Sequence, residues 1–144
     1  MPDRLDDIME AFEFLDDWEE RFEYLIGLGK ALPGLPDAEK VAANKVEGCT
    51  SQVWLTSSVA ERDGEPVLHF DADSDAHIVR GLIAVLLAAY SDRTVDEILA
   101  TDVDAAFREM GLDKHLSPNR RNGFSAMVGR INGTAKAVRE ARAA

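Results

Sequence analysis

The sequence predicts an α+β domain in which a short antiparallel β-sheet packs against helices in two layers. Helical periodicity dominates both ends of the chain, and a hairpin signal joins two strand-like stretches near its middle. No repeat or linker divides the 144 residues. A chain of this length, with 46% apolar residues, can bury a hydrophobic core without disulfides or metal. We therefore expect one domain that spans residues 1–144.

Two amphipathic helices are expected at the N-terminal end. In the first, apolar residues recur three to four positions apart from Leu5 to Phe12. The second begins near Asp17 and is stopped by a proline–glycine pair. Gly27 and Gly29 lie inside this second helix, and we interpret both as packing positions rather than as a nucleotide-binding loop.

A β-hairpin is expected in the middle of the chain. Residues 35–46 precede it and predict a loop with one helical turn. Residues 51–59 and 65–73 are rich in strand-forming residues. Between them, Asp63 and Gly64 form a pair typical of a type I′ turn, in which both central residues need positive φ.

Helices are expected again from residue 76 to the C-terminus. Residues 73–75 offer side-chain oxygens that could cap the helix over residues 76–90, whose nearly continuous apolar character indicates burial on most sides. Residues 94–97 have the pattern of a capping box. A further helix runs from about residue 103 to Gly111.

The last helix is expected to begin at Ser117 and Pro118, which supply a cap and a first-turn proline. Gly123, Gly129 and Gly133 lie inside it, and each costs up to about 1 kcal/mol relative to alanine. Their presence suggests close packing or partial fraying.

The composition argues against several function classes. A net charge of −11 disfavours nonspecific nucleic-acid binding, and no apolar run approaches the length that spans a bilayer. One cysteine rules out an intramolecular disulfide, and no secretion signal is visible, so we expect a cytoplasmic protein. Nine acidic residues crowd the first twenty positions and basic residues dominate from Lys114 onward. These charges could simply be two solvated faces that attract each other, or they could form a docking surface for a protein.

Metal binding is poorly supported because the histidines His69, His77 and His115 lie far apart without the usual ligand spacing. A catalytic dyad between the single cysteine, Cys49, and His69 or His115 remains open, since folding could bring either pair together.

Cys49 is the residue most able to carry chemistry. A buried structural role is common for a lone cysteine. However, Gly48 allows a sharp bend, so Cys49 can lie at a loop tip that enters a strand. Lys45 favours the thiolate, whereas Glu47 opposes it. A thiolate that attacks a sulfur–sulfur bond needs no second catalytic residue, so sulfur transfer fits one cysteine.

The stretch Val46-Glu47-Gly48-Cys49-Thr50-Ser51-Gln52-Val53-Trp54 resembles the cysteine loop of the SufE family of sulfur-acceptor proteins. Three other stretches resemble the family in the same order, so the resemblance covers nearly the whole chain. They are residues 18–33, 73–85 and 115–124.

The resemblance implies a compact α+β fold similar to IscU-type scaffolds. It also implies that Cys49 accepts persulfide sulfur from a SufS-like, pyridoxal-phosphate-dependent cysteine desulfurase, stimulates that enzyme and passes sulfur toward a SufBCD-like iron–sulfur scaffold. The pyridoxal phosphate would belong to the desulfurase, so no resident cofactor is expected. We expect an accessory protein rather than a stand-alone enzyme.

Partner contacts are expected at the cysteine loop and at the basic segment 114–121. The residues concerned are Gly48, Ser51, His115 and Arg120. Arg120 could equally be a helix-terminal arginine tied to a carboxylate. Two other functions stay open: a non-covalent allosteric adaptor of a desulfurase, in which Cys49 is structural, and a thiol enzyme that pairs Cys49 with a histidine.

Overall fold

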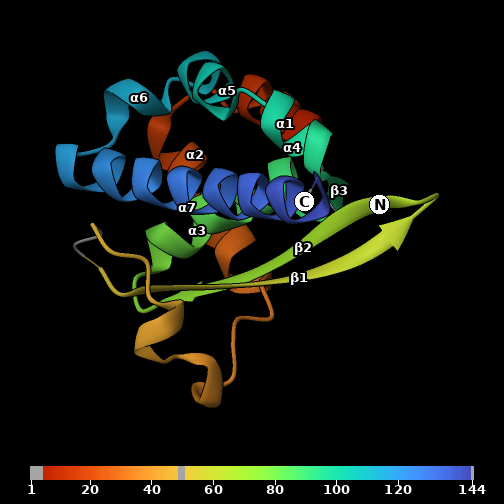
Figure 1. Ribbon diagram of the computed structural model, residues 1–144. Coiled ribbons are helices and arrows are strands. Elements are labelled where there is room, and N and C mark those ends of the chain that lie inside the picture. The colour runs from red at the N-terminus through yellow and green to blue at the C-terminus, as the bar shows by residue number, and fades with distance from the viewer. Residues whose placement is uncertain (1–4, 49–50, 144) are drawn as a thin grey trace.

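Helices cover one face of an antiparallel sheet, while the segment that carries two short 3₁₀ turns lies on the opposite side (Figure 1). The computed structural model describes the backbone of residues 5–48 and 51–143. The α+β prediction is confirmed. In chain order the elements are α1 Leu5–Phe14, α2 Trp18–Ala31, η1 Asp37–Glu39, η2 Ala42–Asn44, β1 Val53–Arg62, β2 Glu65–Ser74, α3 His77–Tyr90, β3 Arg93–Thr94, α4 Val95–Ala100, α5 Val103–Met110, α6 Leu112–His115 and α7 Pro118–Ala143.

The sheet has the order β1-β2-β3. β1 and β2 form the predicted hairpin, and its turn residues Asp63 and Gly64 have φ values of 56° and 81°. Both angles are positive, as the type I′ turn requires. The short strand β3 pairs with β2 through Leu68 and Arg93 and through their neighbours. β3 is not predictable from the sequence, because two residues are too few to show an alternating pattern.

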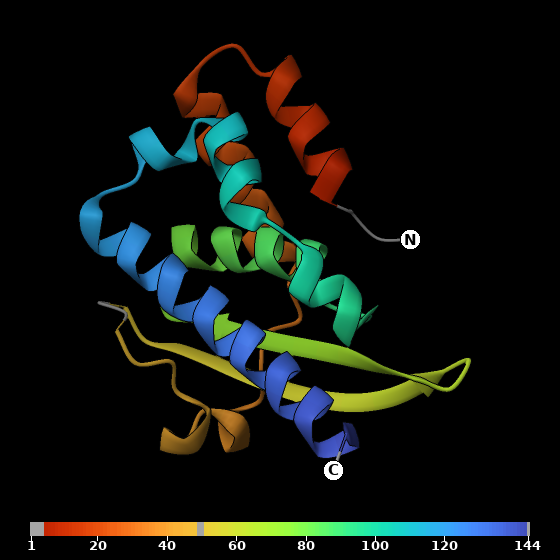
Figure 2. The same ribbon diagram turned by 45° about the horizontal axis from the view of Figure 1, so that its top comes forward.

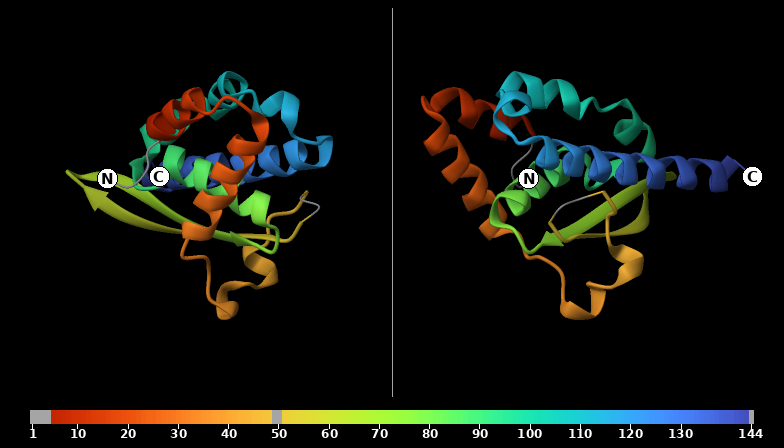
Figure 3. Two further views of the ribbon diagram at one scale, coloured as in Figure 1. Left: turned by 180° about the vertical axis from the view of Figure 1, so that it is seen from behind. Right: turned by 90° about the vertical axis from the view of Figure 1, so that its left-hand side faces the viewer.

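Helix α3 lies at the centre of the molecule, between the sheet and the other helices (Figure 2). Figure 3 shows α2 on the side of α3 that faces away from α7. This arrangement explains the nearly continuous apolar sequence of α3, because neighbouring elements cover it on several sides. The largest fully buried side chains are Tyr90, Phe70, Ile8, Leu25, Leu68, Leu82, Ile83, Leu86, Ile98, Leu112, Ile131 and Val53.

Most predicted helix boundaries are confirmed. Asp17 caps α2 by accepting a hydrogen bond from the N–H of Glu20. Thr94 and Glu97 form the predicted capping box of α4. Gly111 ends α5 in the left-handed conformation, with φ of 78°. The four-residue helix α6 was not predicted because one helical turn is too short for a periodic pattern.

The prediction that residues 73–75 cap α3 is wrong for its aspartates. The N-cap residue is Ala76, and no side chain caps it. The hydroxyl of Ser74 does accept a hydrogen bond from the N–H of Ala76, at 3.2 Å. The carboxylates of Asp73 and Asp75 bind other partners instead.

The prediction that glycines mark close packing is confirmed at one position and wrong at others. Gly29 is a packing position, since a Cβ there would lie 2.7 Å from the backbone nitrogen of Gly81 in α3. The same interpretation is wrong for Gly27, which has nothing within 4 Å of that point. Gly129 and Gly133 in α7 also face open space, so close packing does not explain them.

The basic side chains at the end of α7 pair with residues close to them in space. Arg139 binds Asp96 at 2.5 Å, and Arg142 binds Glu61 at 2.9 Å. These partners belong to α4 and β1, so the interaction of these two arginines is not with the acidic N-terminal helices.

Candidate functional site

The loop that carries the predicted acceptor is held at its base by hydrogen bonds from its own backbone and to Asp75. Val46 N–H donates to the carbonyl of Val53 at 2.9 Å. Gln52 N–H donates to Asp75 Oδ1 at 3.1 Å, and Asp75 N–H donates to the carbonyl of Gln52 at 3.4 Å. Cys49 itself lies outside the described residues. The structure therefore describes where the loop begins and ends.

Helix α7 supports the entrance to this loop. The Arg130 guanidinium donates to the carbonyl oxygens of Ala43 and Lys45, at 2.9 and 3.0 Å. Gly48 has φ of 90°, a conformation that favours glycine and agrees with the predicted bend. A Cβ at Gly48 would lie 3.4 Å from that of Ala126, so the loop passes close to α7.

A cavity of about 330 Å³ lies beside the loop, between α3 and the first half of α7. Its volume falls at the lower end of the range for small-molecule and cofactor sites. One part of its wall is apolar and consists of Val53, Val79, Leu82, Phe124 and Met127. The polar part consists of Ser51, Ser117, Asn119 and Arg120, with Gly123 completing the lining.

The structure brings together three of the four predicted partner-contact residues. Ser51 and Arg120 line the cavity, and Gly48, three positions before Ser51, lies close to Ala126 of α7. No carboxylate among the described residues forms an ion pair with Arg120. His115 lies elsewhere, because its ring stacks on Trp18 at 3.8 Å between centroids.

The apolar part of the cavity is not predictable from the sequence. Phe124 and Met127 have the helical spacing of core residues, and Val79 and Leu82 belong to an apolar helix. Such a pattern predicts burial but not which of the buried side chains border a cavity. The only sequence signal near them was the Ser-Pro start of α7, which places polar side chains at the same end of the helix.

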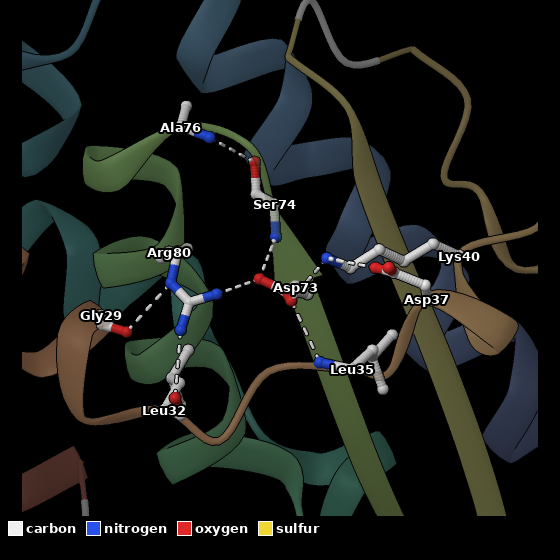
Figure 4. Close-up of polar contacts among 9 residues, drawn as sticks. All are labelled: Gly29, Leu32, Leu35, Asp37, Lys40, Asp73, Ser74, Ala76 and Arg80. Carbon is white, nitrogen blue, oxygen red and sulfur yellow. Dashed lines mark hydrogen bonds and ion pairs between the residues drawn. The ribbon is translucent and has the colours of Figure 1, made fainter.

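A buried carboxylate ties this region to the remainder of the fold (Figure 4). Asp73 is only 4% exposed. It accepts hydrogen bonds from the N–H groups of Leu35 and Ser74, at 3.0 and 2.8 Å. It also forms ion pairs with Arg80 and with Lys40 Nζ, the latter at 3.4 Å. These four donors compensate for the loss of water around the buried charge.

The two cations extend this network in opposite directions. Arg80 donates to the carbonyls of Gly29 and Leu32 at the end of α2, at 3.1 and 3.0 Å. Lys40 Nζ lies 5.6 Å from the centroid of the Trp54 ring, on the strand that leaves the loop. Asp73 therefore connects the end of α2, the segment before the loop and the strand after it.

We expect Asp73→Asn to destabilise the fold by about 2 kcal/mol at neutral pH, because the cations lose their buried partner. Burial opposes ionisation of Asp73, but the N–H donors, Arg80 and Lys40 together lower its pKa below the ordinary 3.8. This stabilisation is present above pH 3.8 and is lost as the pH falls through the lowered pKa. Urea unfolding of both proteins from neutral to acidic pH should show their difference shrink. A difference that stays constant with pH would contradict this assignment.

His69, one of the two histidines considered for a catalytic dyad, lies on β2 opposite Ser58. Its Nδ1 is 2.7 Å from Asp92 Oδ1 and its Nε2 is 3.2 Å from Asp71 Oδ2. Neither His69 nor His115 lines the cavity beside the loop. The hydrogen bond to Asp92 and the charge of Asp71 raise the pKa of His69, although partial burial opposes them.

The raised pKa of His69 predicts pH-dependent stability. The stabilisation is fully present below the ordinary value of 6.5 and is lost as the pH rises through the folded-state pKa. This contribution to the free energy of unfolding should stay below about 1 kcal/mol, because the side chains of His69 and Asp92 are half exposed. Urea unfolding between about pH 6 and 9 should show the difference between wild type and His69→Gln shrink with rising pH. The exposed His77→Gln is the matched control, and an equal trend for both variants would contradict the prediction.

Residues 5–48 and 51–143 contain no group of three or more histidine, cysteine or acidic side chains able to hold a metal ion. Over the same residues, no helix combines the length and apolar character needed to cross a bilayer.

Fold and site together define a small α+β protein whose glycine-bent loop is tied at its base and bordered by a cavity with one apolar and one polar wall. The chain belongs to the SufE family, described as an Fe–S metabolism associated domain, whose sequence profile matches residues 6–135.

Curated relatives agree with this assignment. An uncharacterized SufE-like protein of Rhizobium etli is 49% identical over 132 residues, which cover 92% of this chain and 89% of the relative. Another, from Rhizobium meliloti, is 46% identical over 132 residues, covering 92% and 94%. The solution structure of a hypothetical protein from Thermus thermophilus matches with a TM-score of 0.71 at 18% identity, covering 92% of this chain and 93% of that protein. At that identity, the last comparison establishes the fold alone.

Proposed function

We propose that this protein is a cytoplasmic sulfur acceptor and carrier. Cys49 takes persulfide sulfur from a SufS-like cysteine desulfurase that uses pyridoxal phosphate, and the protein stimulates that enzyme. It then passes the sulfur toward a SufBCD-like iron–sulfur scaffold. The observation that carries this proposal is membership of a family associated with Fe–S metabolism, in a chain whose only cysteine lies in the stretch that resembles the family's cysteine loop.

The chemistry requires one nucleophile. The Cys49 thiolate attacks the terminal sulfur of the desulfurase persulfide, a new sulfur–sulfur bond forms on Cys49, and the desulfurase thiolate leaves. No net oxidation or reduction occurs, because one persulfide is exchanged for another. A thiolate of the acceptor then takes the same sulfur, and the Cys49 thiolate is released.

The geometry around the loop supports this role. Hydrogen bonds at Val46 and Gln52 hold the two ends of the loop, and Arg130 fixes its entrance. We propose that this loop contacts the partner together with residues 114–121. Arg120 has no carboxylate partner among the described residues, so its charge is available to a partner protein.

The test is intact-mass spectrometry after the protein is mixed with a cysteine desulfurase and free cysteine. The proposal expects a gain of whole sulfur atoms that maps to Cys49 and is removed by a reductant. Raised desulfurase activity without such a gain would instead favour the allosteric adaptor. Turnover of a small substrate without any desulfurase would favour a thiol enzyme.

A further inference from the structure

A second cavity, of about 350 Å³, lies on the other side of α3 from the cysteine loop. Its walls come from α2 and α3, which cross in the view from behind (Figure 3). Leu28 and Leu32 form one wall, and Ala84, Leu87 and Ala88 form the other. All five side chains are partly exposed, so the cavity presents an apolar surface that solvent can reach.

The floor of this cavity consists of buried side chains. Ile8 from α1 and Phe70 from β2 line it, and each is only 1% exposed. The backbone N–H of Phe70 donates to the Ser91 hydroxyl at 2.9 Å, which fixes the strand against the end of α3. A cavity of this size with a fixed floor has the dimensions of a small-molecule site.

One end of the cavity is polar and carries an excess of negative charge. His69, Asp71 and Asp92 all line it. Each ring nitrogen of His69 faces a carboxylate oxygen, and the doubly protonated ring is the state that donates to both. One imidazolium and two carboxylates leave a net charge of −1. Each carboxylate uses one oxygen on the ring, and a carboxylate can accept hydrogen bonds on both oxygens.

We propose that this cavity binds a small aliphatic ammonium ion. The hydrocarbon chain lies between Leu28 and Leu32 on one side and the alanines of α3 on the other. The ammonium group donates to Asp71 and Asp92. An apolar chain is favoured because it covers the exposed walls. A cationic head group is favoured because the polar end has more negative than positive charge.

Two other ligand classes fit less well. A divalent metal ion needs an unprotonated imidazole nitrogen, whereas both nitrogens of His69 are directed at carboxylates. A carboxylate ligand would find one cation beside two anions. The proposal does not depend on the sulfur chemistry, because it concerns the opposite side of α3.

The test is an NMR titration of the full-length protein labelled in its alanine methyl groups, with hexylamine as the probe. Signals of Ala31, Ala84 and Ala88 should shift and saturate, while the exposed Ala60 on the hairpin stays unchanged. Hexanoate and hexan-1-ol have the same chain without the positive charge. They should bind about tenfold more weakly, as expected for loss of charged contacts at a partly exposed site.

Variants separate the two parts of the site. Replacing both Asp71 and Asp92 with asparagine should remove the preference for hexylamine. Asp96→Asn, in α4 and outside the lining of this cavity, should not. Ala88→Leu fills the apolar part and should weaken all three probes. Equal binding of hexylamine and hexanoate to the wild type, or no saturable shift, would overturn the proposal. Equally tight binding of Nα-acetyl-lysine N-methylamide would overturn the small-molecule assignment in favour of a protein lysine.

Discussion

Replacing Cys49 with serine is expected to reduce sulfur acceptance and desulfurase stimulation to the background without the protein. Serine has nearly the same shape, but its hydroxyl is not ionised at neutral pH and cannot form the persulfide. The chain has no second cysteine that could take over the reaction. Stability should change little, because the two side chains have nearly the same shape. Sulfide release by the desulfurase and urea unfolding measure the two effects.

A relocated thiol is the matched control for this prediction. Ser57 is exposed on β1, away from the cavity beside the loop. A variant with Cys49→Ser and Ser57→Cys has the same composition of thiols but should stay inactive. Restored stimulation would show that any accessible thiol suffices, and unimpaired stimulation by Cys49→Ser alone would refute the carrier role.

Local signals explain the part of the fold that the sequence predicts well. The turn at Asp63 and Gly64, the capping box at Thr94 and the left-handed end at Gly111 each depend on a few adjacent residues. Such signals act before tertiary contacts form, so they can be read from the chain directly. The family's cysteine loop was also recognisable, because its residues are contiguous.

Tertiary contacts explain what the sequence analysis missed. Asp73 was interpreted as a helix cap, a role its side chain can fill locally. In the structure it binds Arg80 and Lys40, and Arg80 in turn reaches the carbonyl of Gly29, 51 positions away. The cavity beside the loop depends in the same way on how α3 and α7 meet. Neither the Asp73 network nor the contact between α3 and α7 leaves a spacing pattern in the sequence.

Gly81→Ala is expected to destabilise the protein by about 3 kcal/mol and to lower Tm by about 10 °C. The backbones of α2 and α3 cross closely at Gly81 and Gly29. A Cβ at Gly81 would contact the carbonyl oxygen of Leu25 and would lie 2.7 Å from its carbonyl carbon. Both are backbone atoms, so the clash can be relieved only by moving one helix. That cost exceeds the roughly 1 kcal/mol that alanine gains over glycine inside a helix.

Gly129→Ala provides the matched control, with the opposite sign. It makes the same substitution inside α7, where nothing lies within 4 Å of the added Cβ. Only the helix-propensity term remains, so stability should rise by up to about 1 kcal/mol. Urea unfolding and thermal melts of the two variants measure both changes. If both variants were stabilised, the crossing of α2 and α3 would have to be looser than described. Gly81 is followed in α3 by Leu82, which lines the cavity beside the loop. A shift of α3 in Gly81→Ala should therefore impair sulfur acceptance, whereas Gly129→Ala should accept sulfur normally.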